Sequence, residues 1–494
     1  MLVTLYTSRV VLSELGVDNY GVYSIVGGIV GVLGFLNISM SAVTQRFLNY
    51  EMGVAGVHSN KLAAIFSTSI SIHSLICVIV LVISETLGLW FLNSKLVIPQ
   101  ESIVGANVVF QTSVLSFCIA VMRVPFNATI IAHEKMDIYA YISVLEAILL
   151  LLSAYALNAV GSSKLTYYGL FVLGVNIIVA ILYMCCCKHF FRECSFHIKL
   201  FSHQLFSEMI RFAGWNLLGS LSWIIRGQGL GIILNLFYGP VLNAAKGIAD
   251  QILNAVNAVT NNFQTALNPQ ITKSYASNHI EEMQQLVFRG LKFSCFLVWI
   301  VALPLIISIS EILSLWLTTV PPLTSIFAVL ILIDCLISCL FGSPLVSAIS
   351  ATGRIRNMQI VSGGILLLIL PTSYLALKFG ISPQVIFIFN IIFNFLSGLS
   401  KLYYSSVLIA FSIKKYLSIT FLPVLGVTVT SSIVPFLFKC LLLPSHNISD
   451  ILSFLILSIT SVACVIICTW MMGLSSNERV AVKGLISKHL RRYN

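Results

Sequence analysis

Charged residues are scarce in this chain. They make up 9% of its 494 residues, and acidic residues are the rarer kind, with 17 Asp and Glu against 28 Lys and Arg. Hydrophobic residues account for 58%, and the mean hydropathy is +0.98. A water-exposed surface needs more polar side chains than this. The composition therefore excludes a water-soluble globule and predicts a protein whose main solvent is lipid.

Sequence motifs of several functional classes are also missing. No Gly-x-x-x-x-Gly-Lys-Ser/Thr phosphate loop occurs, so direct use of ATP is not expected. No His-x-x-x-x-Asp pattern and no pair of metal-binding residues occurs within a predicted helix, so we expect neither an enzyme nor a cofactor. The basic residues form no clustered face apart from the C-terminal tail, so no nucleic-acid partner is expected.

What the sequence does contain is a series of thirteen apolar runs that fill most of its length. Each is about as long as the ~20 helical residues that cross a ~30 Å hydrocarbon core. The runs are Tyr20–Thr44, Leu62–Leu92, Ile103–Ala132, Ile138–Ala159, Tyr167–Cys187, Phe212–Tyr238, Ala244–Leu267, Phe293–Leu317, Thr324–Ala351, Met358–Leu377, Gln384–Ala410, Leu417–Leu443 and Ile451–Met472. We expect residues 1–15 to be part of a truncated first helix rather than a signal peptide, because no basic segment precedes them. The sequence thus predicts an all-α polytopic membrane protein with about 13–14 transmembrane helices.

Lys and Arg residues are concentrated in alternate gaps between these runs. One set of gaps holds Arg46, Lys61, Lys135, Lys188, Arg192, Lys199, Arg211, Lys273, Arg289, Lys292, Arg354, Arg356, Lys401, Lys414, Lys415, Arg479, Lys483, Lys488, Arg491 and Arg492. The opposite set holds only Arg9, Lys95, Lys164, Lys378 and Lys439. Because short cytoplasmic loops retain basic residues, the first set is predicted to face the cytoplasm, together with the C-terminus.

The two halves of the chain resemble each other. Glu85-Thr-Leu-Gly-Leu-Trp90 returns later in the chain as Glu311-Ile-Leu-Ser-Leu-Trp316. Pro125, Ala132 and Tyr155 return as Pro344, Ala351 and Tyr374, all three at the same offset in residue number. We interpret the halves as two six-helix repeats that have the same orientation, since six is even, and are related by an axis along the membrane normal. Chance similarity between Leu-rich helices is the alternative interpretation.

This interpretation divides the chain into five regions. They are an N-terminal lobe (1–187), a cytoplasmic linker (188–207), a C-terminal lobe (208–411), two additional transmembrane helices (412–473) and a basic cytoplasmic tail (474–494). Two helical lobes with a cleft between them are typical of transporters, in which the site faces either side of the membrane in turn. The basic tail favours contact with anionic lipid.

A few basic residues lie within the apolar runs, where a charge is kept only inside a bundle or a wet cavity. Arg226 has no acidic residue within one helical turn, so it is a candidate for binding an anion, with extension of its side chain toward the interface as the alternative. Lys246 and Asp250 are four residues apart and either neutralise each other or contact substrate. Arg9 and Arg46 fall in the equivalent helices of the first half and complete the candidate anion site.

Other polar residues in the runs suggest further roles. Asp250 and Asp334 are candidates for ion coupling or for contact between the lobes. Arg123 lies two residues before Pro125, so we interpret it as an interfacial or helix-break residue rather than a cargo contact. Amides give the opening helices of the second half a polar face that suits either sugar hydroxyls or interhelical hydrogen bonds. These amides are Asn235, Asn243, Asn254, Asn257, Asn261, Asn262 and Gln264.

Four segments resemble those of a known family. They are Ser8-Arg9-Val-Val-Leu-Ser-Glu-Leu-Gly16-Val-Asp-Asn-Tyr20-Gly21-Val-Tyr23, Thr44-Gln-Arg46-Phe47, Ala132-His-Glu-Lys-Met136 and Phe237-Tyr-Gly239-Pro240. Over nearly its whole length the chain resembles the polysaccharide or O-antigen repeat-unit flippases (lipopolysaccharide biosynthesis proteins) of the multidrug/oligosaccharidyl-lipid/polysaccharide exporter superfamily. The resemblance implies a two-lobed flippase with a cationic central cavity and ion coupling.

The resemblance also implies a cargo and a location. It implies alternating-access transport of an undecaprenyl-diphosphate-linked oligosaccharide across the bacterial inner membrane, for polysaccharide or lipopolysaccharide biosynthesis. The partners would be this lipid-linked oligosaccharide, membrane lipids, a coupling proton or sodium ion and a polysaccharide polymerase. Three alternatives stay open: a cation-coupled multidrug exporter of the same superfamily, a membrane enzyme and a non-transporting relative.

Overall fold

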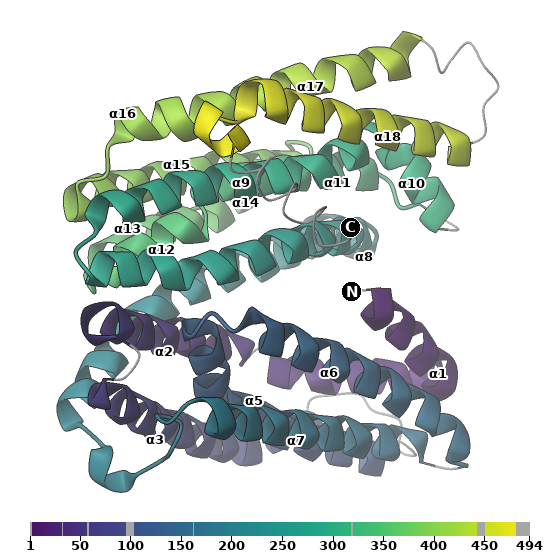
Figure 1. The fold of residues 1–494 in the computed structure, drawn as a ribbon. Coiled ribbons are helices and arrows are strands. Elements are labelled where there is room, and N and C mark those ends of the chain that lie inside the picture. Colours follow the sequence, from purple (N-terminus) through teal and green to yellow (C-terminus); the bar gives the residue numbers. More distant parts are fainter. Residues whose placement is uncertain are drawn as a thin grey trace, which may run out of the picture. The chain divides into compact units, whose positions relative to one another are not determined.

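The regular structure of this chain is helical throughout the residues that the computed structural model describes, which are 2–31, 33–56, 59–94, 103–161, 163–317, 320–441 and 450–480 (Figure 1). Eleven helical segments in this part of the chain are long and apolar enough to cross a membrane. The predicted all-α polytopic class is therefore confirmed. The chain divides into two compact units, Met1–Leu221 (unit 1) and Ser222–Asn494 (unit 2), and the division falls within one long helix, α8 (His203–Ala276).

Two of the thirteen predicted runs differ from the spans in the structure. Tyr20–Thr44 is divided between α1 (Leu2–Gly31) and α2 (Gly34–Ala55). Ala244–Leu267 is the second half of α8, where amide side chains and a Lys lower the hydropathy, and only its first half, up to Tyr238, qualifies as a span.

Unit 1 begins with a bent helix. Within α1, Gly16 has a φ of 74°, a left-handed value that glycine adopts readily. Residues on the N-terminal side of this break are helical too, and Val11 and Leu15 are buried in a cluster with Leu157 and Tyr168. The rest of the unit consists of α2, α3 (Asn60–Ile83), the π-helix η1 (Ser84–Gly88), α4 (Leu89–Ser94), α5 (Ile103–Ala132), α6 (Met136–Ala156), the 3-10 helix η3 (Leu157–Ala159), α7 (Lys164–Phe190), the 3-10 helix η4 (Ile198–Leu200) and the start of α8.

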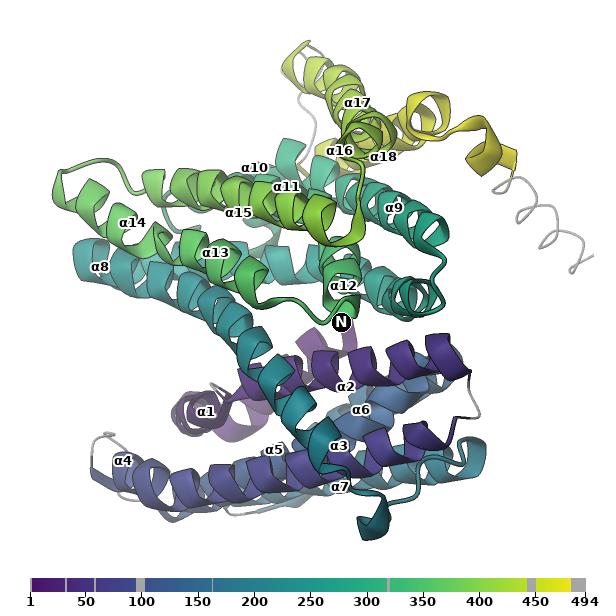
Figure 2. The same ribbon diagram turned by 90° about the vertical axis from the view of Figure 1, so that its left-hand side faces the viewer.

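Unit 2 continues α8 and adds the remaining helices. They are α9 (Ile280–Ile307), α10 (Ile309–Trp316), α11 (Thr324–Leu340), α12 (Ser343–Ala351), α13 (Arg356–Leu367), α14 (Ile369–Lys378), α15 (Val385–Ile409), α16 (Ile413–Tyr416), η5 (Leu417–Phe421), α17 (Leu422–Leu441), α18 (Asp450–Cys468) and η7 (Thr469–Gly473). Figures 1 and 2 show α17 and α18 lying side by side. They correspond to the two additional helices predicted after the second repeat.

The order and spacing of the helices agree with the internal repeat. Four helices of unit 1 have counterparts in unit 2 whose first residues are offset by nearly the same amount. The pairs are α3 and α9 (Asn60 and Ile280), α5 and α11 (Ile103 and Thr324), α6 and α13 (Met136 and Arg356), and α7 and α15 (Lys164 and Val385). The turn after α5 also has a left-handed residue, Glu134, and the turn after α12 has its counterpart, Gly353.

The repeats differ at their shared proline. Pro125 lies inside the continuous helix α5, whereas the corresponding segment of unit 2 is interrupted at Phe341 and Gly342, so that Pro344 occupies the first turn of α12. A proline in the first turn leaves no hydrogen bond broken, because the first amides of a helix have no partner within it.

Candidate functional site

Unit 2 contains a cavity of about 260 Å³ that four ionisable side chains line. Arg226, Lys246 and Asp250 come from α8, and Asp334 comes from α11. Two amides, Asn254 of α8 and Asn390 of α15, and several apolar and aromatic side chains complete the lining. The cavity thus gathers three of the predicted anion-site and coupling residues from one helix and the fourth from another.

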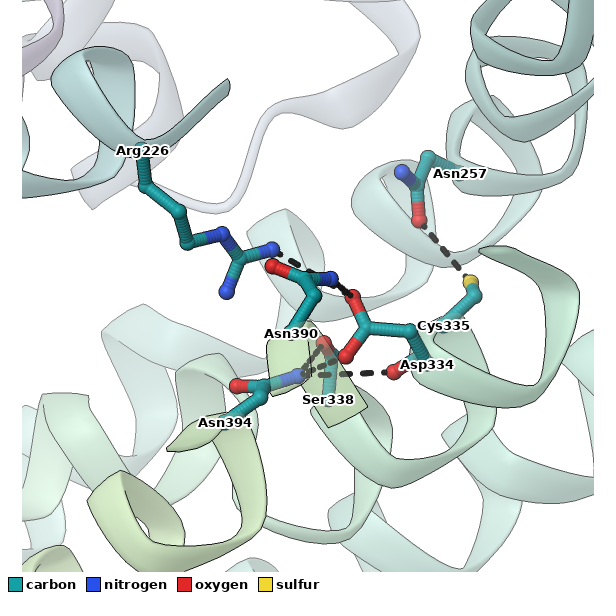
Figure 3. Close-up of polar contacts among 7 residues, drawn as sticks. All are labelled: Arg226, Asn257, Asp334, Cys335, Ser338, Asn390 and Asn394. Carbon is teal, nitrogen blue, oxygen red and sulfur yellow. Dashed lines mark hydrogen bonds and ion pairs between the residues drawn. The ribbon is translucent and has the colours of Figure 1, made fainter. Parts of the chain in front are cut away.

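Asp334 is the centre of a polar network in this cavity (Figure 3). Arg226 Nη2 lies 3.3 Å from Asp334 Oδ2, to which Asn390 Nδ2 also donates at 2.8 Å. Asn394 Nδ2 donates to Asp334 Oδ1 at 2.7 Å and to Ser338 Oγ at 2.7 Å. Asp334 is 5% exposed. A buried carboxylate is expensive unless it is paired and hydrogen-bonded, and here both oxygens are satisfied.

Helical spacing explains how these side chains meet. Asp334 and Ser338 are four residues apart on α11, and Asn390 and Asn394 are four apart on α15. Residues four apart lie on the same helix face, so each helix presents a two-residue polar stripe to the other. The spacing of the two asparagines in an otherwise apolar run is a signal that the sequence analysis missed.

Lys246 and Asp250 form an ion pair across one turn of α8. Lys246 Nζ lies 2.6 Å from Asp250 Oδ2, so the structure shows the ion pair that was one of the two alternatives left open by their spacing. The Lys246 side chain is 11% exposed and that of Asp250 is 39% exposed. Asp250 is therefore the more accessible partner.

Each base in this cavity consequently has a carboxylate partner within the described residues, and the formal charges balance. The partner of Arg226 lies on another helix, far away in the sequence, so the absence of an acid within one helical turn did not reveal it. Anion binding by Arg226 and Lys246 stays a prediction.

The two candidates from the first half have other surroundings. The guanidinium of Arg46, on α2, lies over the rings of Phe47, Tyr50 and Phe212 at 4.6, 5.2 and 5.2 Å from their centroids. Such stacking is typical of arginine. Arg9 lies on α1, and its side chain is outside the described part of the structure.

Arg123 lies in a separate part of unit 1. Its Nη1 lies 3.1 Å from Glu146 Oε1, and its guanidinium lies 5.4 Å from the centroid of Tyr183. The structure thus gives this residue an ion pair with α6.

Unit 1 has a cavity at the equivalent place in the repeat, of about 230 Å³. Its lining includes Tyr23, Thr112 and Ser116, and none of the residues that line it is an acid, a Lys or an Arg. The first residues of paired helices in the two units differ by nearly constant residue numbers. The same difference pairs three lining residues of this cavity with charged or amide residues that line the unit 2 cavity. The pairs are Val30 and Asp250, Ser113 and Asp334, and Gly169 and Asn390.

Comparisons with known proteins identify structures that share this fold. No family model and no curated protein matches the chain. Solved structures of MATE transporters of the MOP superfamily match it at 12–15% sequence identity and TM-scores of 0.67–0.70, with 83% of this chain covered. At this identity the likeness shows a shared fold.

Three of these structures illustrate the range. An outward-facing multidrug resistance MATE family transporter of the MOP superfamily has a TM-score of 0.70 at 14% identity. A point mutant of the MATE transporter VcmN from Vibrio cholerae has a TM-score of 0.70 at 15% identity. A MOP superfamily transporter from Pyrococcus furiosus, described as having a binding pocket of reverse polarity, has a TM-score of 0.68 at 12% identity. In each case 83% of this chain and 92% of the other chain are covered.

Proposed function

We propose that this protein is a flippase that moves a lipid-linked oligosaccharide diphosphate across the bacterial inner membrane, from the cytoplasmic leaflet outward, by alternating access. The observation that carries the proposal is the pair of basic side chains, Arg226 and Lys246, in one cavity within a membrane-spanning bundle of MATE-like fold. A diphosphate needs fixed cations to replace its hydration, and Arg and Lys supply charge-assisted hydrogen bonds.

The geometry around Asp334 suggests how Arg226 becomes available to an anion. Arg226 touches the carboxylate through one contact of 3.3 Å, which is long for a charge-assisted hydrogen bond. Asn390 and Asn394 donate to the two carboxylate oxygens at 2.8 and 2.7 Å. Arg226 can therefore turn to a phosphate while Asp334 keeps two hydrogen bonds.

Ion coupling follows from the same exchange. If a proton or a sodium ion neutralises Asp334, the attraction that holds Arg226 is lost, and Arg226 binds the diphosphate more strongly. Release of the ion restores the Arg226–Asp334 pair and expels the anion. An inside-negative membrane potential adds about 2.3 kcal/mol per net negative charge and 100 mV in favour of outward movement, so an ion that travels with the cargo lowers this contribution by one charge.

The proposed cargo determines the path across the membrane and the partner that receives the product. The oligosaccharide would enter the wet cavity while the polyprenyl tail stays in lipid, and a polysaccharide polymerase on the far side would use the product. The excess of basic residues in alternate gaps favours a cytoplasmic C-terminus. Reporter fusions at Lys273 and Val320 should therefore lie on opposite sides of the membrane.

Complementation tests the proposal most simply. A strain that lacks its own flippase should regain surface polysaccharide when it expresses this chain, and it should accumulate lipid-linked glycan inside when it expresses Arg226→Gln. Restored export by Arg226→Gln at wild-type level would contradict the anion site.

Export of organic cations is the second candidate function. It is favoured by the 39% exposure of the Asp250 side chain and by the aromatic residues Trp223 and Phe387 in the same cavity. Aromatic rings and carboxylates both attract cations. Resistance of expressing cells to cationic drugs, lost in Asp250→Asn, would support this function over the flippase.

A further inference from the structure

A groove of about 750 Å³ lies in unit 1 among α3, α5 and α7. The lining residues extend from Phe66 to Cys77 on α3, from Leu115 to Phe126 on α5 and from Ile177 to Lys188 on α7, so each helix lines the groove over a rise of eleven residues. At a rise of about 1.5 Å per residue the groove is ~16 Å long. Half of a ~30 Å hydrocarbon core is ~15 Å, so the groove has the length of one leaflet and hence of one acyl chain.

The ends of the groove differ in chemistry. Contacts between the helices fix the direction: Cys77 Sγ lies 3.4 Å from the Cys118 carbonyl oxygen at one end, and Cys187 Sγ lies 3.3 Å from the Phe126 carbonyl oxygen at the other. Most of the lining is apolar. The second end carries Lys188 and the segment 194–197, with Arg123 about one turn further in.

The polar end is positively charged. Lys188 is exposed, lies two residues before the end of α7 and has no ion-pair partner in the described part of the chain. Glu146 is the partner of Arg123, but it is not among the residues that line the groove, none of which is acidic. His197 donates its backbone N–H to Ser67 Oγ at 3.3 Å, which holds the segment at the mouth against α3.

We propose that this groove is a binding site for an anionic phospholipid, with one acyl chain along α3, α5 and α7 and the phosphate at Lys188 and Arg123. The charge at the mouth favours an anionic headgroup over a zwitterionic one, and the match to one leaflet favours an acyl chain over a longer occupant. The C-terminal tail of the chain is itself basic, which disfavours it as the occupant of a basic mouth. This site requires only that the protein lies in a membrane and is independent of the cargo.

Native mass spectrometry of the full-length protein tests the site. The protein is purified, delipidated and titrated with phosphatidylglycerol or with phosphatidylcholine. The wild type should retain phosphatidylglycerol preferentially. Lys188→Gln should lower phosphatidylglycerol occupancy by about fivefold, the factor for one basic residue near a membrane surface, and should remove the preference.

Two further variants separate the groove from general lipid binding. Ala180→Trp fills the groove and should lower the occupancy of both lipids. Lys199→Gln removes an exposed charge of η4 that does not line the groove and should behave as the wild type. Equal retention by Lys188→Gln and Lys199→Gln, full retention by Ala180→Trp, or equal binding of the two lipids by the wild type would overturn the proposal.

Discussion

The two units contain cavities at the same place in the repeat, but only the cavity of unit 2 is lined by charged side chains. In unit 2 the cavity is lined by two bases, two carboxylates and two amides, whereas the unit 1 cavity has hydroxyls, small residues and apolar side chains. Asp334 of unit 2 corresponds to Ser113 of unit 1, and Asp250 corresponds to Val30. The repeat therefore conserves the position of the hollow, while the charges that can bind an anion or a coupling ion belong to unit 2.

The two units also differ in the polar residues of the paired helices α3 and α9. In unit 1 a buried network on α2 and α3 consists of hydroxyls and an imidazole: Thr44 Oγ1 lies 3.0 Å from Ser69 Oγ, which lies 3.3 Å from His73 Nδ1. Lys292 of α9, buried in an ion pair with Glu478, corresponds to the buried Ile72 of α3 when the starts of the two helices are aligned. The comparison thus distinguishes the cavity, which both units share, from the charged side chains, which only the unit 2 cavity has.

The largest effect is expected from Asp334→Ser, which gives unit 2 the residue of unit 1. It leaves Arg226 without its carboxylate and removes the carboxylate that accepts from Asn390 and Asn394, so we expect a loss of about 3–5 kcal/mol in the free energy of unfolding. Thermal unfolding in detergent measures this. Ser113→Ala, the matched change in unit 1, should stay within about 1 kcal/mol. Equal losses of melting temperature in the two variants would contradict the proposed difference between the cavities.

Arg226→Gln should reduce export by about 10- to 100-fold while the protein remains in the membrane, because a hydrogen bond to a charged group contributes about 1.5–3 kcal/mol. Arg226→Lys should retain part of the activity, since Lys offers a point charge without the planar fork. The control is Lys61→Gln in unit 1, which removes an exposed base that pairs with the buried Glu51. Export of lipid-linked glycan in complemented cells is the readout, and equal loss in Lys61→Gln would argue for a nonspecific effect.

Asp250→Asn distinguishes the two candidate functions. It removes the accessible carboxylate beside Lys246, so a phosphorylated cargo should bind up to about fivefold more tightly and an organic cation more weakly. Fluorescence or calorimetry with the purified protein measures whether the affinity for each ligand rises or falls. Weaker binding of the phosphorylated ligand by Asp250→Asn would contradict the flippase.

A smaller, pH-dependent effect is expected where the chain leaves η7. Burial disfavours the charged form of Glu478, but hydrogen bonds from Lys292 Nζ (2.6 Å) and the Ser475 amide (2.8 Å) prevail and hold the pKa of this carboxyl below its usual range. The charged Glu478 therefore stabilises the fold above its unfolded pKa of about 4.5, and this stability is lost as pH falls through the lower folded pKa.

Glu478→Gln should accordingly lower the melting temperature at pH 7. The deficit relative to the wild type should shrink below about pH 4.5. Ile72 of α3 corresponds to Lys292 of α9, so the matching position of unit 1 has no base to pair with a carboxyl. A deficit that stays constant between pH 7 and pH 4 would show that shape rather than charge matters here.

Much of the fold could be predicted from the sequence because each signal was local. Apolar runs predicted the spans, and the i,i+4 spacing of Lys246 and Asp250 indicated their ion pair as one of two alternatives. The division between α1 and α2 was missed because the apolar run continues through Gly31 and Gly34 without a charge or a proline.

The centre of the site could not be predicted in this way. Arg226 and Asp334 meet only because α8 and α11 pack together, and no local pattern records a contact between residues so far apart in the sequence. The correspondence of Ser113 with Asp334 was within reach, since the repeat was visible, but it required the alignment that the starts of α5 and α11 provide.

The most direct test is equilibrium binding of an undecaprenyl-diphosphate-linked glycan to the purified protein, with wild type, Arg226→Gln and Asp334→Asn compared. The proposed exchange predicts weaker binding by Arg226→Gln and binding at least as tight as wild type by folded Asp334→Asn, because neutralising the carboxylate releases the arginine. Unchanged affinity in Arg226→Gln would contradict the proposal that the unit 2 cavity holds the diphosphate.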